Sequence, residues 1–250
     1  MVTKKIIPCL DTKDGKVVKG INFVDIEDIG SPPLMAEEYC AQGADEITLL
    51  DISATLENRQ TRLKLVSEVA KKVSVPLAVG GGMRSADEMY EVLNAGADKV
   101  SVNTAAVKNP EMITEAAERF GKQCVIVAID AKTTGGRWEV VTHGGTRSTG
   151  LDAVEWAKKM EDLGAGEILL TSVDADGVKN GYDIPMTRAV ADAVTIPVTA
   201  SGGCGKLEDF YEVFSQTNVS SALAASVFHY RQVTVKEVKD YLRDRGVQVK

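Results

Sequence analysis

The strongest constraint on the fold of this chain is an internal repeat. Residues 43–53 read GADEITLLDIS and residues 164–174 read GAGEILLTSVD, so the two segments align with an offset of 121 residues. The same offset aligns VPLAVGGG at 75–82 with IPVTASGG at 196–203. A repeat of this kind indicates that one structural unit occurs twice in the fold.

The order of the predicted elements identifies that unit. Eight β-rich runs alternate with amphipathic helical stretches such as 57–73 and 85–95, the second opened by Ser85 with Glu88 as a capping box. Strict βα alternation eight times in 250 residues predicts an α/β fold, a closed (β/α)8 TIM barrel. The predicted strands are 5–10, 46–51, 75–79, 98–103, 123–130, 167–172, 196–200 and 220–225.

Composition is consistent with one domain over residues 1–250, made of half-barrels at about 1–121 and 122–250, because 44% hydrophobic residues suffice for one large core. The net charge of −7 argues against nucleic-acid binding, which needs clustered Lys and Arg. No apolar stretch approaches the roughly 20 residues that span a bilayer, and no signal-like segment follows the N-terminal Met. We therefore expect a soluble, cytoplasmic protein with no membrane partner.

Cysteine and histidine spacing indicates neither a metal site nor a disulfide framework. The four cysteines are widely spaced, with no C-x-x-C pattern, and are interpreted as small hydrophobic residues. His143 and His229 are the only histidines and lie in unlike contexts, so a His-centred triad is not expected, although one of them could contact a ligand. The cysteines are Cys9, Cys40, Cys124 and Cys204.

Two acids end two of the predicted strands. Asp11 follows the apolar run at 5–10, and Asp130 closes the run at 123–130. The repeat puts these strands on opposite sides of the barrel, so both carboxyl groups should face each other at the C-terminal mouth, where barrel enzymes build their sites. A lone acid there often only caps a loop, but a matched pair fits one proton donor and one acceptor. We predict that Asp11 and Asp130 are catalytic.

Glycine loops follow the third and seventh predicted strands, GGGM at 80–83 and SGGCG at 201–205. Such loops can simply provide tight turns, but they also expose N–H groups that bind phosphate. Small polar residues follow the next strand in each half and can donate to the same anion, so two phosphate pockets and a substrate phosphorylated at both ends are predicted. The predicted ligands are Gly81, Gly82, Asn103 and Thr104 in one half, and Gly202, Gly203, Ala225 and Ser226 in the other.

Further substrate contacts are predicted around these pockets. The loop DADGVKNGYD at 174–183 lacks the last acidic ligand of an EF-hand, so it is interpreted as a mobile substrate loop. Lys19 lies before the first predicted helix and either closes over the substrate or is an ordinary solvated lysine. The other candidates are Asp51, Ser172, Asp176 and Gly177.

At the opposite end of the barrel, charged residues begin several predicted strands. Counting back by twos from Asp11 puts Cys9, Ile7 and Lys5 on the inward face. Lys5 joins three other charged residues in a predicted ring, which is either an ordinary salt-bridge cluster or a gate on a passage through the barrel. The ring is Lys5, Glu46, Lys99 and Glu167.

Taken in order, these motifs make the chain similar, nearly end to end, to the cyclase subunits of imidazole glycerol phosphate synthase from histidine biosynthesis. The motifs are IIPCLDTKDGKVVKG, GADEITLLDISAT, GGGMRS, ADKVSVNTAAV, VIVAIDAK, GAGEILLTSVDADGVKNGYD, ASGGCGK and ALAASVFHY. The resemblance implies conversion of a bis-phosphorylated ribulosyl-formimino aminoimidazole carboxamide ribonucleotide (PRFAR) and ammonia. The products are imidazole glycerol phosphate and aminoimidazole carboxamide ribonucleotide (AICAR). It implies that Asp11 and Asp130 are the general acid and base, with no metal or redox cofactor.

The resemblance also implies a partner, a glutaminase subunit that docks on the N-terminal face as a heterodimer and delivers ammonia through the predicted ring. The chain departs from the family at Lys5, where arginine is usual and where lysine lacks the planar fork that holds two carboxylates. It departs again at 216–228, which is one residue longer than the family pattern. Which acid first donates a proton is not readable from sequence, because proton affinity depends on burial and neighbours.

Two other functions are compatible with the same motifs. The first is the sister isomerase of the pathway, which also has a duplicated barrel with paired acids and two phosphate sites, and performs an Amadori rearrangement. The second is a non-catalytic barrel that senses phosphate ligands, against which the intact Asp11 and Asp130 argue. The charged ring and the ASVFHY segment favour the cyclase.

Overall fold

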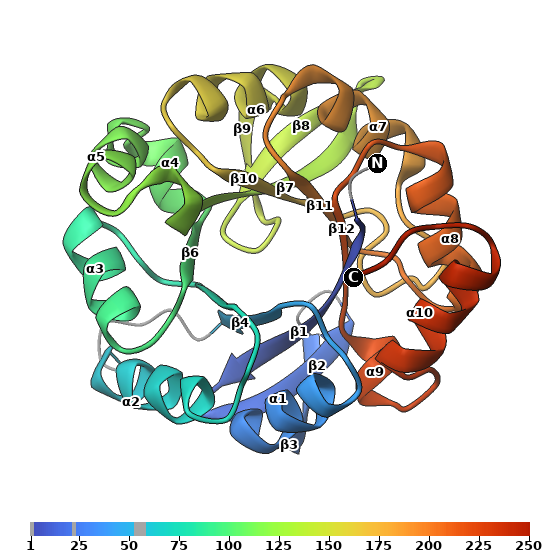
Figure 1. The fold of residues 1–250 in the computed structure, drawn as a ribbon. Coiled ribbons are helices and arrows are strands. Elements are labelled where there is room, and N and C mark those ends of the chain that lie inside the picture. Colours follow the sequence, from blue (N-terminus) through green and yellow to red (C-terminus); the bar gives the residue numbers. More distant parts are fainter. Residues whose placement is uncertain (1–2, 22–23, 53–58) are drawn as a thin grey trace.

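Eight parallel strands close into a barrel in the computed structural model, which describes residues 3–21, 24–52 and 59–250 (Figure 1). Barrel closure occurs where β10 pairs with β7, with Glu167 opposite Ile126. The fold is the predicted (β/α)8 TIM barrel, and each half contributes four adjacent strands. The barrel strands are β1 (Lys5–Lys13), β4 (Ile47–Asp51), β5 (Leu77–Gly80), β6 (Lys99–Val102), β7 (Val125–Thr134), β10 (Glu167–Ser172), β11 (Val198–Ser201) and β12 (Ser221–Ala224).

Helices form a ring outside the strands (Figure 1). The amphipathic helices bury their apolar face, as in the last helix, where Val238 and Leu242 are fully buried and Thr234 and Glu237 form a capping box at its start. Among the described residues, no helix has the length and apolarity needed to span a membrane. The helices are α1 (Pro32–Ala41), α2 (Arg59–Ala70), α3 (Ala86–Asn94), α4 (Thr104–Lys108), α5 (Glu111–Phe120), the 3-10 helix η2 (Lys122–Cys124), α6 (Ala153–Asp162), α7 (Ile184–Ala193), α8 (Leu207–Gln216), α9 (Ser226–His229) and α10 (Val235–Asp244).

The predicted cap of α3 is present in part. Ser85 Oγ accepts a hydrogen bond from the backbone N–H of Glu88 at 3.3 Å, as expected. The Glu88 carboxylate accepts instead from the N–H of Arg84 at 2.8 Å, one residue before the predicted position. Both bonds still satisfy N–H groups at the start of the helix.

Two antiparallel hairpins correct the prediction that the acids end their strands. Strand β1 continues past Asp11 into a turn at 14–15 and pairs with β2, and β7 continues past Asp130 into a turn at 135–136 and pairs with β8. Both turn residues have positive φ in each case, as a two-residue type I′ turn requires. The Asp-Gly pair at 14–15 and the Gly-Gly pair at 135–136 are hairpin signals that the strand predictions did not use. The added strands are β2 (Lys16–Ile21), β3 (Val24–Gly30), β8 (Arg137–Thr142) and β9 (Arg147–Asp152).

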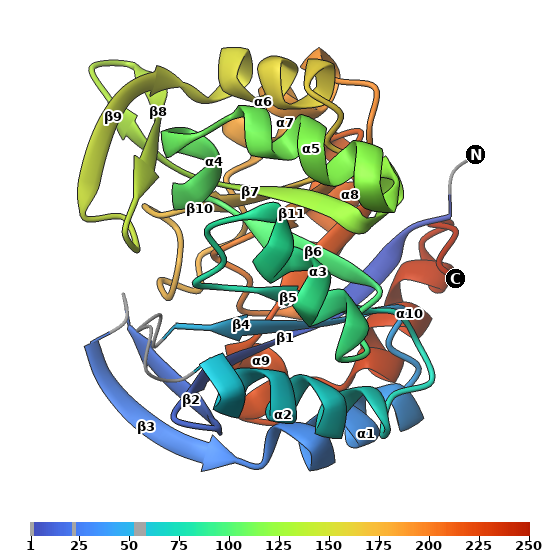
Figure 2. The same cartoon turned by 90° about the vertical axis from the view of Figure 1, so that its left-hand side faces the viewer.

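Both hairpins extend beyond one end of the barrel, and the chain termini lie at the other (Figure 2). This end is the C-terminal one for every barrel strand, because β1 and β7 run into their hairpins here. The hairpins therefore stand beside the mouth where the acids were predicted.

The barrel encloses a small apolar cluster of its own, separate from the larger core between strands and helices. Ile7 and Cys9 belong to this inner cluster, whereas Ile6 and Leu10 belong to the outer core. The alternation confirms that Lys5, Ile7, Cys9 and Asp11 share the inward face of β1. The inner cluster is Ile7, Cys9, Ala78, Ile126, Leu169 and Leu223.

Candidate active site

Asp11 and Asp130 lie at the same height on opposed strands. Strand β1 is separated from β7 by three strands in either direction around the barrel. In register, Asp11 is opposite Leu50, and Asp130 is opposite Thr171, which is the repeat equivalent of Leu50. The structure thus places both carboxyl groups on the inward face near the C-terminal mouth, as the repeat predicted.

Asp130 is held by neighbouring strands. Asn103 Nδ2 donates to Asp130 Oδ2 at 2.8 Å, and the Thr171 hydroxyl also hydrogen-bonds the carboxylate. Burial is the main reason that the pKa of Asp130 is raised to about 6. The hydrogen bond from Asn103 lowers this pKa, the charge of Asp176 raises it, and the hydrogen bond from Thr171 lowers it. A carboxyl group with this pKa exchanges its proton readily near neutral pH.

Asn103 makes a contact that the sequence did not predict. Its amide nitrogen donates to Asp130, and the phosphate contact expected of it stays a prediction. Its Oδ1 atom is buried and has no hydrogen-bond partner among the residues that the structure describes. Asn103 precedes α4, so its backbone still belongs to the first predicted phosphate loop.

Asp11 contacts a residue of its own strand. The thiol of Cys9 lies 3.5 Å from Asp11 Oδ1, and both residues are buried, with Cys9 2% exposed. Leu50 on β4 and Ala225 after β12 occupy the places that Thr171 and Asn103 hold around Asp130. The twin acids therefore have unlike neighbours.

The first glycine loop packs against the strand beside it. A Cβ on Gly81 would lie 2.0 Å from the carbonyl oxygen of Asp51, and the φ of Gly81 is +99°, so only glycine fits. Arg62 from α2 donates to the Gly81 carbonyl at 2.9 Å. On the next loop, Thr104 Oγ1 accepts from the backbone N–H of His143 at the β8–β9 turn, at 3.2 Å.

The second glycine loop repeats this packing. A Cβ on Gly202 would lie 2.7 Å from the carbonyl oxygen of Ser172, the repeat equivalent of Asp51. Ala225 and Ser226 follow β12 at the start of α9, as Asn103 and Thr104 follow β6 at the start of α4. The two loops thus have equivalent backbone positions in the two halves.

The loop at 174–183, predicted to be mobile, packs directly on this glycine loop. Gly181 N–H donates to the Gly203 carbonyl at 2.9 Å, and a Cβ on Gly203 would lie 2.1 Å from the Gly181 carbonyl oxygen. Asp176 N–H donates to the Ser172 carbonyl at 2.9 Å, which brings Asp176 and the adjacent Gly177 beside the mouth. The sequence did not predict these contacts, and the mobility of the loop stays a prediction. Lys19 lies on β2, and its side chain is outside the described residues.

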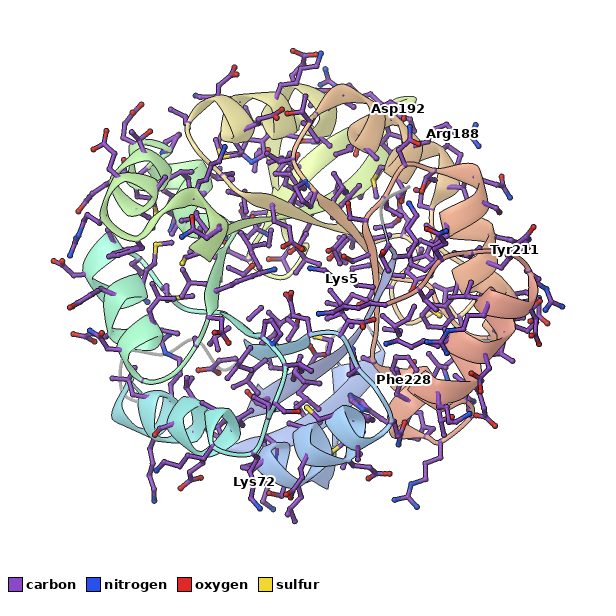
Figure 3. The ribbon with its side chains drawn as sticks, in the orientation of Figure 1. Lys5, Lys72, Arg188, Asp192, Tyr211 and Phe228 are labelled. Atoms are coloured by element: carbon purple, nitrogen blue, oxygen red, sulfur yellow. The ribbon has the colours of Figure 1, made fainter. Side chains whose placement is uncertain are left out.

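The four predicted residues at the other end form one connected ion-pair cluster. Lys99 Nζ donates to Glu46 Oε2 at 2.7 Å and to Glu167 Oε2 at 2.8 Å. Lys5 Nζ lies 3.8 Å from Glu46 Oε2. Lys5 is labelled in Figure 3. Thr199 Oγ1 donates to Glu167 Oε1 at 2.7 Å and completes the cluster.

Electrostatics tie this charged ring together. Burial raises the pKa of Glu46, the carboxylate of Glu167 raises it further, and Lys99 and Lys5 oppose the rise. Burial lowers the pKa of Lys99, but the charges and hydrogen bonds of Glu167 and Glu46 raise it by more. The pKa of Lys99 is therefore raised overall. Within the ring, Lys5 makes the longest ion pair and has the most exposed side chain.

A family model described as histidine biosynthesis protein matches residues 5–234. The chain belongs to this family. It is therefore a barrel enzyme of histidine biosynthesis, and the family match is equally compatible with the cyclase and with the isomerase. Among the described residues, no group of three His, Cys, Asp or Glu side chains is arranged to hold a metal ion.

Three residues beside the acids or the first glycine loop were not predicted from the sequence. Cys9 was read only as a small hydrophobic residue, although its inward position two residues before Asp11 was already visible. Thr171 occupies the same inward face of β10 as Glu167 and could have been found by the same count. Arg62 had no sequence signal, since its contact with Gly81 depends on how α2 packs.

Proposed function

We propose that this histidine biosynthesis enzyme is the cyclase, which converts PRFAR and ammonia into imidazole glycerol phosphate and AICAR. The acid pair and the two glycine loops suit either enzyme of the family. The observation that carries the proposal is the charged ring of Lys5, Glu46, Lys99 and Glu167 at the end of the barrel opposite the acids. A cyclase that takes ammonia through the barrel needs an entrance there, and an isomerase does not.

The barrel interior supports a passage for a small neutral molecule. Above the ring lies the inner cluster, which is apolar except for the Cys9 thiol. Ser101 follows Lys99 on the same inward face of β6, and its buried hydroxyl has no hydrogen-bond partner among the described residues. Asn103 comes next in that row, directly after β6, and its amide donates to Asp130 on β7. A polar group without a partner in an apolar interior can bind a molecule that donates and accepts hydrogen bonds, as ammonia does.

The acids supply the proton transfers of ring formation. Ammonia adds to a carbon centre as an amine leaves, and a second condensation closes the imidazole, so protons must be both taken up and delivered. Asp130, with a pKa of about 6, takes part in these transfers, and Asn103 and Thr171 hold its carboxyl group toward the substrate. Asp11 acts from the opposite wall. The glycine loops at 80–83 and 201–205 bind the two phosphates, so the reacting atoms lie between the acids.

A product assay tests the proposal directly. Purified protein, PRFAR and an ammonium salt at alkaline pH should yield imidazole glycerol phosphate and AICAR, detected by chromatography. The same preparation is given the isomerase substrate as a second arm. Conversion of that substrate alone would assign the isomerase, and conversion of neither would leave the non-catalytic barrel.

The partner proposal has its own test. We propose that a glutaminase subunit docks on the N-terminal face, and that Lys99→Met, which leaves Glu46 and Glu167 without their cation, lowers the yield of product per glutamine hydrolysed by about half or more. Turnover with ammonium salt should change by less than about twofold, since external ammonia reaches the mouth directly. An unchanged yield per glutamine would exclude the ring as the entrance.

A further inference from the structure

We propose that Cys9 is a positioning residue for Asp11, acting through its thiol on the carboxylate. The proposal rests on the proposed function of the acid pair. It assigns Cys9 a part in the reaction beyond filling space in the barrel.

The geometry begins with the strand. Residues two apart on a strand point to the same face, so the Cys9 side chain lies directly beneath that of Asp11 on the inward face of β1. The sulfur is 3.5 Å from Asp11 Oδ1, a distance suited to an S–H donor. Cys9 is 2% exposed, and Asp11 is 9% exposed, so water competes little for this contact.

The other half of the barrel shows that packing at this position does not require a hydrogen-bond donor. Ala128, two residues before Asp130, is the equivalent of Cys9 and also lies against the inner cluster. Asp130 receives its donors from the neighbouring strands, through Asn103 and Thr171.

The two equivalent positions beside Asp11 hold different side chains. Leu50 and Ala225 stand at the positions of Thr171 and Asn103, and neither side chain can donate a hydrogen bond. The strand that carries the acid supplies the thiol instead. Asp11 thus has a donor on its own strand, and Asp130 has donors on neighbouring strands. The position equivalent to Cys9 is Ala128, and the position equivalent to Asn103 is Ala225.

The rest of the inner cluster makes the thiol distinctive. Its other members are Ile7, Ala78, Ile126, Leu169 and Leu223, all without a polar hydrogen. A valine or alanine at position 9 would satisfy the same packing. The contribution specific to cysteine is therefore the contact of its thiol with the Asp11 carboxylate. A carboxylate that accepts a bond from a fixed neighbour keeps fewer rotamers, which favours its reactive orientation.

Steady-state kinetics on the full chain test this inference. Cys9→Ala should lower kcat about 5- to 10-fold, the loss expected for one weak bond to a charged acceptor, with KM changed by less than about twofold. Cys9→Ser, which restores a donor, should keep kcat within about twofold or threefold of the parent. Ile7→Val is the matched control: it changes the same inner cluster on the same strand but no hydrogen bond, and should leave both constants unchanged.

The outcomes separate this inference from the assignment of the reaction. If the parent enzyme turns over the isomerase substrate rather than PRFAR, the cyclase assignment fails, and the variants are measured with that substrate. In either assay, Cys9→Ala with the parent kcat would overturn the proposal, as would Cys9→Ser falling as far as Cys9→Ala. If the alanine variant does not fold, Cys9→Val, which fills the space without a donor, replaces it in the comparison with serine.

Discussion

The two half-barrels place a carboxyl group at the same height on opposed strands and surround it with different side chains. Asp130 is held by an amide and a hydroxyl from adjacent strands, whereas Asp11 contacts a thiol from its own strand. The backbone is repeated closely, down to the two-residue turns that follow each acid. Duplication therefore preserved where the acids stand, while substitution of their neighbours made their environments unequal. Unequal environments suit a reaction in which one acid donates a proton and the other accepts it.

The largest effect is expected from removing each acid in turn. Asp11→Asn and Asp130→Asn should each lower kcat by at least about 1,000-fold, because asparagine is nearly isosteric but cannot transfer a proton. Substrate binding should stay within about tenfold of the parent, measured by calorimetry. An acid whose replacement leaves turnover intact would be removed from the mechanism, and the two halves would then differ in function as well as in surroundings.

The glycine loops test how closely the backbones match. Gly81→Ala should lower the free energy of unfolding by about 3 kcal/mol and Gly202→Ala by about 2 kcal/mol, because both have positive φ and an added Cβ would meet a carbonyl oxygen at 2.0 Å and 2.7 Å. Urea denaturation measures both.

Gly15→Ala is the matched control for these loops, since its φ is also positive but nothing lies within 4 Å of an added Cβ. It should cost only about 1 kcal/mol, the cost of the backbone conformation alone. Equal losses in all three variants would show that the close carbonyl contacts carry no energy.

Asn103→Ala separates two roles for the amide. If Asn103 holds Asp130, kcat should fall about 10- to 30-fold with KM changed by less than about threefold. If its amide instead binds a phosphate, as the sequence predicted, KM should rise more than kcat falls. Initial-rate measurements over a range of substrate concentrations distinguish the two, and Ala225, its counterpart, shows that the fold itself accepts alanine at this position.

The last prediction concerns the effect of Asp130→Asn on stability. The fold favours the neutral form of Asp130, whose pKa is raised from 3.8 to about 6, so the ionised carboxylate destabilises the protein above about pH 6. Asp130→Asn should therefore raise the free energy of unfolding by about 1–2 kcal/mol at about pH 8, and the gain should shrink toward zero as the pH falls to about 4. Denaturation at both pH values checks this, and a gain independent of pH would contradict the raised pKa.

Much of the fold was readable from the sequence because it depends on local periodicity. The alternation of apolar runs and helical stretches located all eight barrel strands, and the repeat offset placed β1 and β7 on opposite sides. The inward face of β1 followed from counting by twos. The hairpins were missed because each strand was predicted to end at its acid, before the turn signals at 14–15 and 135–136.

The sequence by itself determined where the two acids, the glycine loops and the charged ring lie along the barrel, since strand order and side-chain alternation follow from short-range pattern. Only the tertiary structure decided that Asn103 bonds Asp130, that Cys9 lies against Asp11, and that Lys99 joins Glu46 to Glu167. These contacts are set by side-chain orientations and by packing between strands, and burial then sets the pKa of Asp130. The spacing of residues along the chain predicts neither these side-chain contacts nor the pKa of Asp130.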